Sequence, residues 1–285
     1  MATSGATDPV WVHTEPYSNR PTFAKLDRDL DADVCVVGSG IAGVQTAYEL
    51  VTRGHKVVML EARDAIGGET GRTSGHLASA LDDGYVNIAA KHGDKGAVIA
   101  AESHNWALNH VGEVAKKLGI ECEYRKLPGY EVSQYDKNKQ PKEHASEVKE
   151  LKEEVAKCKS IGMDVEFQEG FKVQGWDGEP DQRDAAIFQN QATYHPTKYV
   201  VGILKWLKEQ PNFKCYTHTR VIDTPEKGIE IGPIGRKHVD VKTMDGHTVH
   251  CNDVVMATCV SHNLREELST SGARRRSTTV IGQVS

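Results

Sequence analysis

Three glycines and one acid have the types and spacing that could bind a dinucleotide. Gly38, Gly40 and Gly43 fit the pattern G-x-G-x-x-G, and Glu61 follows the third glycine by eighteen residues. In this pattern the first glycine permits a tight turn, the second lets the backbone approach a pyrophosphate, and the third lets a helix pack closely on a strand. A carboxylate at the position of Glu61 would accept hydrogen bonds from a ribose and would disfavour a 2′-phosphate, so NADP is the less favoured ligand.

The elements that must position these residues can be predicted from the sequence around them. Residues 33–37 alternate little in polarity and are rich in β-branched side chains, as in a strand buried on both faces of a parallel sheet. Apolar residues then recur at helical spacing from Ile41 to Val51, which would place a phosphate at a helix N-terminus. A second strand-like run, KVVMLEA, carries Glu61 near its end. This order favours dinucleotide binding over a purely structural turn and predicts a doubly wound α/β sheet, but it leaves NAD, FAD and S-adenosylmethionine open.

The segment after the second predicted strand favours a flavin dinucleotide. It contains Arg63, the pair Gly67-Gly68, and then Arg72, Thr73 and Ser74. Two adjacent glycines suit a loop whose backbone approaches a ligand, and Arg72 with the two hydroxyls could contact phosphate and ribitol oxygens. NAD-type domains usually pass straight into another helix or strand at this point. Taken alone, Arg72 has the simpler interpretation of a solvated loop arginine.

These segments resemble the FAD-dependent oxidoreductases of the D-amino-acid oxidase type, which include glycine oxidase and sarcosine oxidase. The run GGETGRTSGHLAS is similar in particular to a subgroup in which a Rieske iron–sulfur domain follows the flavoprotein part. The resemblance covers roughly residues 30 to 260 and implies FAD as cofactor, an amine or amino acid as substrate, and hydride transfer from a C–N bond to the flavin. It implies contacts to the cofactor from Gly38, Ser39, Gly40, Ile41, Ala42, Gly43, Glu61, Ala62, Arg63, Gly68, Arg72, Thr73, Ser74, Val221, Ala257 and Thr258.

The resemblance also predicts how the chain is divided. An N-terminal extension over 1–30 precedes a Rossmann-like FAD-binding domain formed by 31–118 and 193–260, with an irregular tail over 261–285. Residues 119–192, with short strand-like runs and a charged amphipathic helix, would form part of an inserted α+β substrate domain. Pro196 suits the first turn of a helix. His195 before it could be a general base, but a structural role at the helix start is the favoured interpretation, and no catalytic residue is assigned.

The resemblance ends near residue 260, whereas family members normally continue for at least another hundred residues. We therefore expect a fold that is incomplete at the C-terminus, with weak activity at best. A homo-oligomer or a partner protein could cover the incomplete side. Two alternatives to a flavin amine oxidoreductase stay open: a catalytically inactive FAD-binding fragment or isoform, and an NAD-dependent dehydrogenase.

Composition excludes several other classes of function. The 285 residues carry a formal net charge of −5, which argues against nucleic acid or anionic lipid as a partner. No apolar run reaches membrane-spanning length, and the first thirty residues show no secretory signal. The six cysteines are scattered without the spacing of metal ligands, which predicts reduced thiols in a cytoplasmic protein and no metal site.

Overall fold

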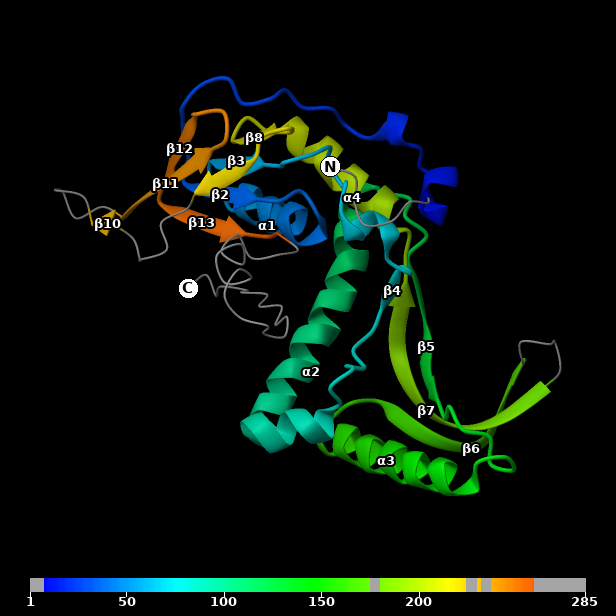
Figure 1. The fold of residues 1–285 in the computed structure, drawn as a ribbon. Helices are drawn as coiled ribbons and strands as arrows, with labels where there is room; N and C mark the ends of the chain where they lie inside the picture. The colour runs from blue at the N-terminus through cyan, green and yellow to red at the C-terminus, as the bar shows by residue number, and fades with distance from the viewer. Residues whose placement is uncertain (1–7, 175–179, 224–229, 232–236, 259–285) are drawn as a thin grey trace, which may run out of the picture. The chain divides into compact units, whose positions relative to one another are not determined.

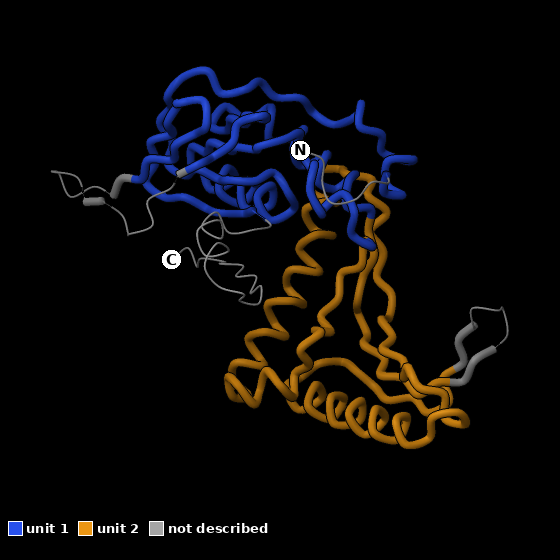
Figure 2. The backbone as a smooth tube through the Cα atoms, in the orientation of Figure 1, with its two compact units in different colours: residues 1–74, 195–285 blue, residues 75–194 orange. Residues whose placement is uncertain are grey.

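The computed structural model describes residues 8–174, 180–223, 230–231 and 237–258 (Figure 1). The chain divides into two compact units, one formed by residues 1–74 with 195–285 and the other by residues 75–194 (Figure 2). The predicted irregular tail over 261–285 lies outside the described residues. No helix in the described part of the chain is long and apolar enough to cross a membrane.

A parallel four-stranded sheet forms the centre of the first unit. Its order is β13 (Asp253–Met256), β2 (Val34–Val37), β3 (Val57–Leu60) and β8 (Phe213–Tyr216), and each neighbouring pair is parallel. Every residue of β2 and β3 is buried, as their apolar sequences predict. Helices α1 (Ile41–Thr52) and α4 (Pro196–Lys208) pack on this sheet and on each other. The predicted α/β fold with strand, glycine turn, helix and strand is therefore confirmed.

A second sheet packs on the first. It contains β1 (Leu30–Asp31), β12 (Thr248–Cys251), β11 (Lys237–Thr243), β10 (Glu230–Ile231) and β9 (Val221–Asp223). Alternate side chains of β2 and β3, such as Cys35 and Val58, share one apolar cluster with Val241 and Val249 of this sheet. A β-sheet, and not a second layer of helices, thus covers this face of the parallel sheet. The Asp245-Gly246 pair, which in sequence is typical of a hairpin turn, joins β11 to β12, and Gly246 has a φ of +87°.

The N-terminal segment contributes two short 3-10 helices, η1 (Val10–His13) and η2 (Tyr17–Asn19). The chain that follows them runs beside the loop after β8. Thr217 donates from its backbone N–H to the carbonyl of Ala24 (3.1 Å) and from its hydroxyl to the carbonyl of Phe23 (2.8 Å). Leu26 donates from its N–H to the hydroxyl of Thr219 (3.0 Å). The predicted N-terminal extension is thus bonded into the first unit.

The second unit combines two helices with an antiparallel sheet. Helices α2 (Tyr85–Leu118) and α3 (Pro141–Ser160) share an apolar cluster with side chains of the sheet. The longest strand, β7 (Pro180–Thr193), pairs with β4 (His76–Leu77), β5 (Arg125–Val132) and β6 (Val165–Gln174). The sequence pattern places Val148, Leu151, Val155 and Cys158 on one face of α3; the last three are buried, and Val148 is partly buried.

Four features of the second unit differ from what the sequence predicts. The strand β7 has no counterpart among the predicted strands. The periodicity of the sequence predicts a helix over residues 94–120, but α2 begins earlier, at Tyr85, and Gly93 interrupts its helical geometry with a φ of +73°. Trp106, which that pattern counts among the apolar positions of the helix, is 61% exposed. The second compact unit begins at Gly75 and includes α2. The family resemblance instead assigned residues 31–118 to the FAD-binding domain.

Candidate functional site

The first glycine turn is shaped by contacts that only glycine tolerates. Gly38 follows β2, has a φ of +107°, and donates its N–H to the carbonyl of Leu60 (2.8 Å). A Cβ atom on Gly43 would lie 1.9 Å from the carbonyl oxygen of Gly38, so no side chain fits there. Because α1 packs this closely on the turn, its N-terminus is held at the carboxyl edge of the parallel sheet. The role predicted for the third glycine, close packing of helix on strand, is the one observed.

Glu61 turns its carboxylate toward this turn. Its Oε2 accepts hydrogen bonds from the N–H and the hydroxyl of Ser39 (both 2.9 Å), and its Oε1 accepts from the N–H of Arg63 (2.9 Å). A carboxylate offers about four lone-pair positions, so three bonds leave capacity for a further donor such as a ribose hydroxyl. Burial first, and the Glu61 charge second, raise the pKa of the Cys215 thiol on β8. The thiol of this buried cysteine is therefore neutral near Glu61.

The second glycine segment, residues 65–73, joins the first turn through two hydroxyl groups. Ile41 at the start of α1 donates its N–H to the hydroxyl oxygen of Thr70 (3.0 Å), and Ile66 donates its N–H to the hydroxyl oxygen of Ser39 (3.4 Å). Gly40, the N-cap of α1, gives that helix no side-chain cap, and a Cβ on it would lie 3.1 Å from the Thr70 hydroxyl. An oxygen acceptor thus already occupies the helix N-terminus, where orphan N–H groups favour anions.

Thr70 was missing from the residues that the sequence predicts for this site. It lies in the short 3-10 helix η3 (Glu69–Arg72), directly after the Gly67-Gly68 pair. A hydroxyl at this place in a glycine-rich loop is the signal that could have identified it, because such side chains can cap a nearby helix N-terminus.

The other predicted residues of this segment differ in how exposed they are. A Cβ on Gly68 would lie 3.6 Å from Nη2 of Arg63, so the arginine covers the glycine pair. Arg72 is half-buried at the end of η3, and Thr73 and Ser74 after it are exposed. The two predicted alanines, Ala42 and Ala62, are exposed as well.

Two segments from the C-terminal half reach the same turn. Ala257 follows β13 and donates its N–H to the carbonyl of Val37 (2.9 Å). Its Cβ lies 3.3 Å from the position that a Cβ on Gly43 would take. Thr258 beside it is exposed. Upstream of the buried Val221, Thr219 donates its N–H to the carbonyl of Glu61 (2.9 Å). The structure thus gathers predicted residues more than 200 positions apart in the sequence around one turn.

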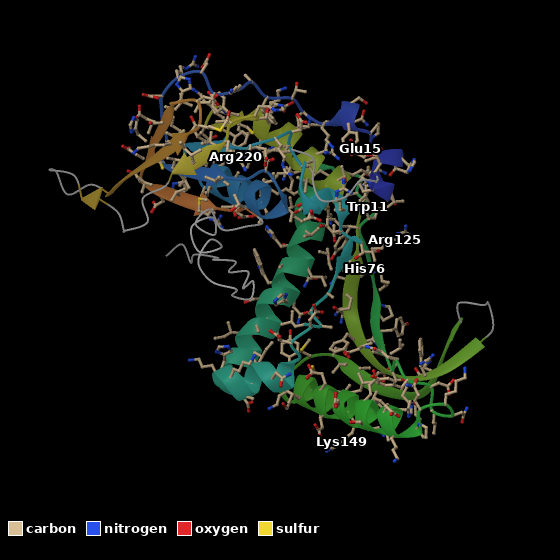
Figure 3. All side chains as sticks on the ribbon, in the orientation of Figure 1. Trp11, Glu15, His76, Arg125, Lys149 and Arg220 are labelled. Carbon is tan, nitrogen blue, oxygen red and sulfur yellow. The ribbon has the colours of Figure 1, made fainter. Side chains whose placement is uncertain are left out.

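The N-terminal segment also reaches this region, which the sequence did not indicate. Trp11 of η1 donates from its indole Nε1 to the carbonyl of Thr73 (2.8 Å) (Figure 3). Arg20 donates from Nη1 to the carbonyls of Ala65 (3.4 Å) and Ile66 (3.2 Å). No local pattern could have revealed these bonds, because the partners lie at least 45 residues apart in the chain.

His195, weighed in the sequence as a general base, has structural contacts. It is the N-cap of α4, where its Nδ1 accepts a hydrogen bond from the N–H of Lys198 (3.2 Å). Its Nε2 is 2.8 Å from the hydroxyl oxygen of Thr14, and its ring lies 4.7 Å from the Trp11 ring, centroid to centroid. The side chain is only 2% exposed. These contacts support the favoured interpretation, a histidine that starts a helix.

Comparison with known proteins identifies relatives of this arrangement. The family model described as FAD dependent oxidoreductase, DAO, matches residues 33–284. A Bacillus subtilis protein, YhfW, whose name describes a Rieske 2Fe-2S iron–sulfur protein, is 24% identical over 242 residues, or 85% of this chain and 42% of the relative. The gamma-glutamylputrescine oxidoreductase of Escherichia coli is 31% identical over 103 residues, or 36% of this chain and 24% of the relative.

Solved structures share the fold. An L-amino acid deaminase from Proteus vulgaris superposes with a TM-score of 0.60 at 20% identity, over 89% of this chain and 60% of that one. Glycine oxidase from Geobacillus kaustophilus gives a TM-score of 0.60 at 15% identity, over 80% of this chain and 55% of that one. The chain therefore spans about half the length of the proteins that it resembles.

Proposed function

The chain belongs to the DAO family of FAD-dependent oxidoreductases, and we propose that its first glycine turn, Glu61 and the second glycine segment form the FAD site. The observation that carries this proposal is the convergence of Glu61, the N-terminus of α1 and Thr70 on one turn. The family assignment favours FAD over NAD, a choice that the glycine pattern alone leaves open. The predicted contact residues, with Thr70 added, are proposed as the cofactor-binding set.

The residues present fit the parts of a flavin dinucleotide. The Glu61 carboxylate, already oriented by Ser39 and Arg63, has acceptor capacity for the adenosine ribose. The N-terminus of α1 supplies N–H groups and a favourable dipole for the pyrophosphate, and Thr70 shows that an oxygen is accepted there. Arg63 and Arg72 provide positive charge on the neighbouring segment.

The reaction proposed is oxidation of the carbon–nitrogen bond of a small amine or amino acid. FAD would supply the acceptor for the hydride, and the protein residues would bind and orient the cofactor. Relatives and structural neighbours carry names of this kind, including an oxidoreductase of gamma-glutamylputrescine, a glycine oxidase and an L-amino acid deaminase. We also propose that residues 75–194, the second unit, belong to the part that receives the substrate.

Cofactor content of the purified protein tests the proposal. The wild type should show the two visible absorption bands of a bound flavin, whereas Gly40→Val should lose them because a side chain there obstructs the pyrophosphate. The apo fold should tolerate Gly40→Val, since the nearest atom to the new Cβ is the hydroxyl of a single side chain, Thr70. Ala145→Val, on the exposed face of α3, is the matched control. Unchanged flavin content in a folded Gly40→Val protein would contradict the assignment.

A second candidate function is an FAD-binding protein without turnover. It is favoured by the absence, from the residues that the structure describes, of any group that the contacts identify as a general base. Assay of the flavin-loaded protein with D-amino acids, L-amino acids, sarcosine and glycine, with oxygen or an artificial acceptor, separates the two. Flavin reduction by one of these substrates supports the oxidoreductase, and flavin bound without reduction by any of them supports the second candidate.

A further inference from the structure

The N-terminal segment over residues 10–20 donates side-chain hydrogen bonds to both ends of the second glycine segment, to the carbonyls of Ala65 and Ile66 and to that of Thr73. From these contacts we infer that residues 10–20 position residues 65–73 for cofactor binding, with Trp11 and Arg20 as the two positioning residues. This inference rests on the proposed function, because the cofactor concerned is FAD. Neither residue belongs to the predicted contact set.

Trp11 holds the end of the segment. Its indole N–H donates to the carbonyl of Thr73 at 2.8 Å, and its ring packs at 4.7 Å from the buried His195 ring (Figure 3). His195 is itself fixed by the N–H of Lys198, three residues after it in α4, and by the hydroxyl of Thr14, three residues after Trp11. The start of α4 therefore positions the indole ring through His195, and the indole N–H in turn positions the backbone of Thr73.

Arg20 holds the beginning of the segment. Its Nη1 reaches the carbonyls of Ala65 and Ile66, and its guanidinium carbon lies 4.4 Å from the centroid of the Tyr17 ring. Its Nη2 would be 3.8 Å from a Cβ on Gly71, so the guanidinium lies against the backbone of η3. A planar guanidinium with several donors can bridge two carbonyls in this way, whereas a lysine ammonium is a single point of contact.

The same segment also carries the bonds to the first turn, from Ile41 to Thr70 and from Ile66 to Ser39. Residues 65–73 are thus bonded both to the glycine turn and to the N-terminal segment, with few regular backbone bonds of their own. Surface loops of this kind open locally unless other parts of the protein hold them. If the loop is correctly placed only part of the time, the apparent affinity for the ligand falls by that fraction.

Two substitutions remove the positioning bonds while keeping the packing. Trp11→Phe keeps an aromatic ring beside His195 but removes the indole donor, and Arg20→Met keeps the length of the side chain but removes the guanidinium donors. Their matched controls are Trp106→Phe, at an exposed tryptophan of α2, and Arg53→Met, whose guanidinium bonds only to Glu49 of the preceding helix in the contacts described.

Two readouts are needed on each protein. The first is the FAD dissociation constant by fluorescence titration, and the second is amide hydrogen exchange of residues 65–73 in the protein without FAD. We expect Trp11→Phe to bind FAD about 2- to 12-fold more weakly, which is the range for the loss of one hydrogen bond, and Arg20→Met, which loses two, to bind it at least as weakly. We also expect faster exchange in residues 65–73 but not in β2 and β3. Both controls should match the wild type.

The outcomes separate this inference from the proposed function. Absence of FAD binding by the wild type would overturn the proposed function and, with it, the cofactor role of the N-terminal segment. FAD binding by the wild type with unchanged dissociation constants in Trp11→Phe, Arg20→Met and their double variant would overturn the inference alone. Faster exchange throughout β2, β3 and residues 65–73 would also overturn it, since the segment would then support the whole unit and not the loop.

Discussion

The two glycine segments of the first unit are held in position by different kinds of contact. In the turn over residues 38–43, backbone atoms determine the geometry: Gly38 bonds to Leu60 of β3, and a Cβ on Gly43 would overlap the carbonyl of Gly38. In residues 65–73, side chains from distant parts of the chain determine it, with Thr70 bonded to α1 on one side and Trp11 and Arg20 on the other. The first segment is therefore rigid through close packing, and the second through long-range hydrogen bonds.

This difference has consequences for mutation. Backbone overlap cannot be relieved without moving a strand or a helix, so substitution of Gly38 or Gly43 in the first segment should cost stability. Hydrogen bonds between side chains and carbonyls each contribute only about 0.5–1.5 kcal/mol to the free energy of unfolding. Substitution in the second segment should therefore mainly change the position of the loop at the ligand site.

The largest effect is expected from Gly43→Ala. The added Cβ would lie 1.9 Å from the carbonyl oxygen of Gly38, and the helix would have to move away from the turn. We expect a loss of more than about 4 kcal/mol in the free energy of unfolding, or no folded protein at all. Thermal denaturation of the protein without cofactor measures the effect.

Gly68→Ala is the matched control in the second segment. Its φ of −104° suits any residue, and the nearest atom to the new Cβ, 3.6 Å away, is the end of the Arg63 side chain. We expect a change within about 1 kcal/mol. Equal losses at Gly43 and Gly68 would show that the two segments do not differ in the way described.

An intermediate effect is expected from Glu61→Ala, which removes the group that faces the first segment. The substitution leaves the N–H of Ser39 without its carboxylate partner and leaves the ribose hydroxyls of FAD unpaired. At a cost of about 1 to 3 kcal/mol, FAD should bind roughly 5- to 150-fold more weakly. Flavin fluorescence titration provides the measurement, with Glu143→Ala in the exposed first turn of α3 as control. An unchanged dissociation constant would remove Glu61 from the site.

The smallest effect is expected from Thr70→Val, at the bond that joins the two segments. Valine keeps the branched shape but leaves the N–H of Ile41 without the hydroxyl that it bonds in this structure. We expect about 1 kcal/mol lower stability by urea denaturation, and no loss for Thr70→Ser, which retains the acceptor. Equal stability of the valine and serine variants would show that the hydroxyl does not contribute to joining the segments.

Local patterns predicted much of the first unit. The buried strands β2 and β3, the glycine turn, helix α1 and the buried face of α4 all follow from runs of apolar residues and their spacing. In the second unit, β7 was missed because residues 180–193 mix charged, amide and small residues without a clear alternation. The strand depends on pairing with three others along the sheet, and such pairing has no local signal.

The residues of the candidate site likewise fall into those that local patterns predicted and those that they missed. The glycines and Glu61 could be proposed from their spacing, because a dinucleotide turn constrains residues that are close in sequence. Thr70 was missed although it lies within the second glycine segment, and Trp11 and Arg20 had no signal at all. Each of these side chains bonds to a backbone group that is distant in the chain, so it contributes to the site only when the fold brings the two groups together.

The sequence by itself determined the strand, turn and helix around Gly38 to Gly43 and the acid that follows them, because steric limits and apolar periodicity act over a few neighbouring residues. Only the tertiary structure decided that Glu61 turns its carboxylate to Ser39, that Ala257 closes against Gly43, and that residues 10–20 hold the second glycine segment. Those contacts join groups separated by up to about 200 residues, and folding brings such groups together only when strands, helices and loops pack as one unit.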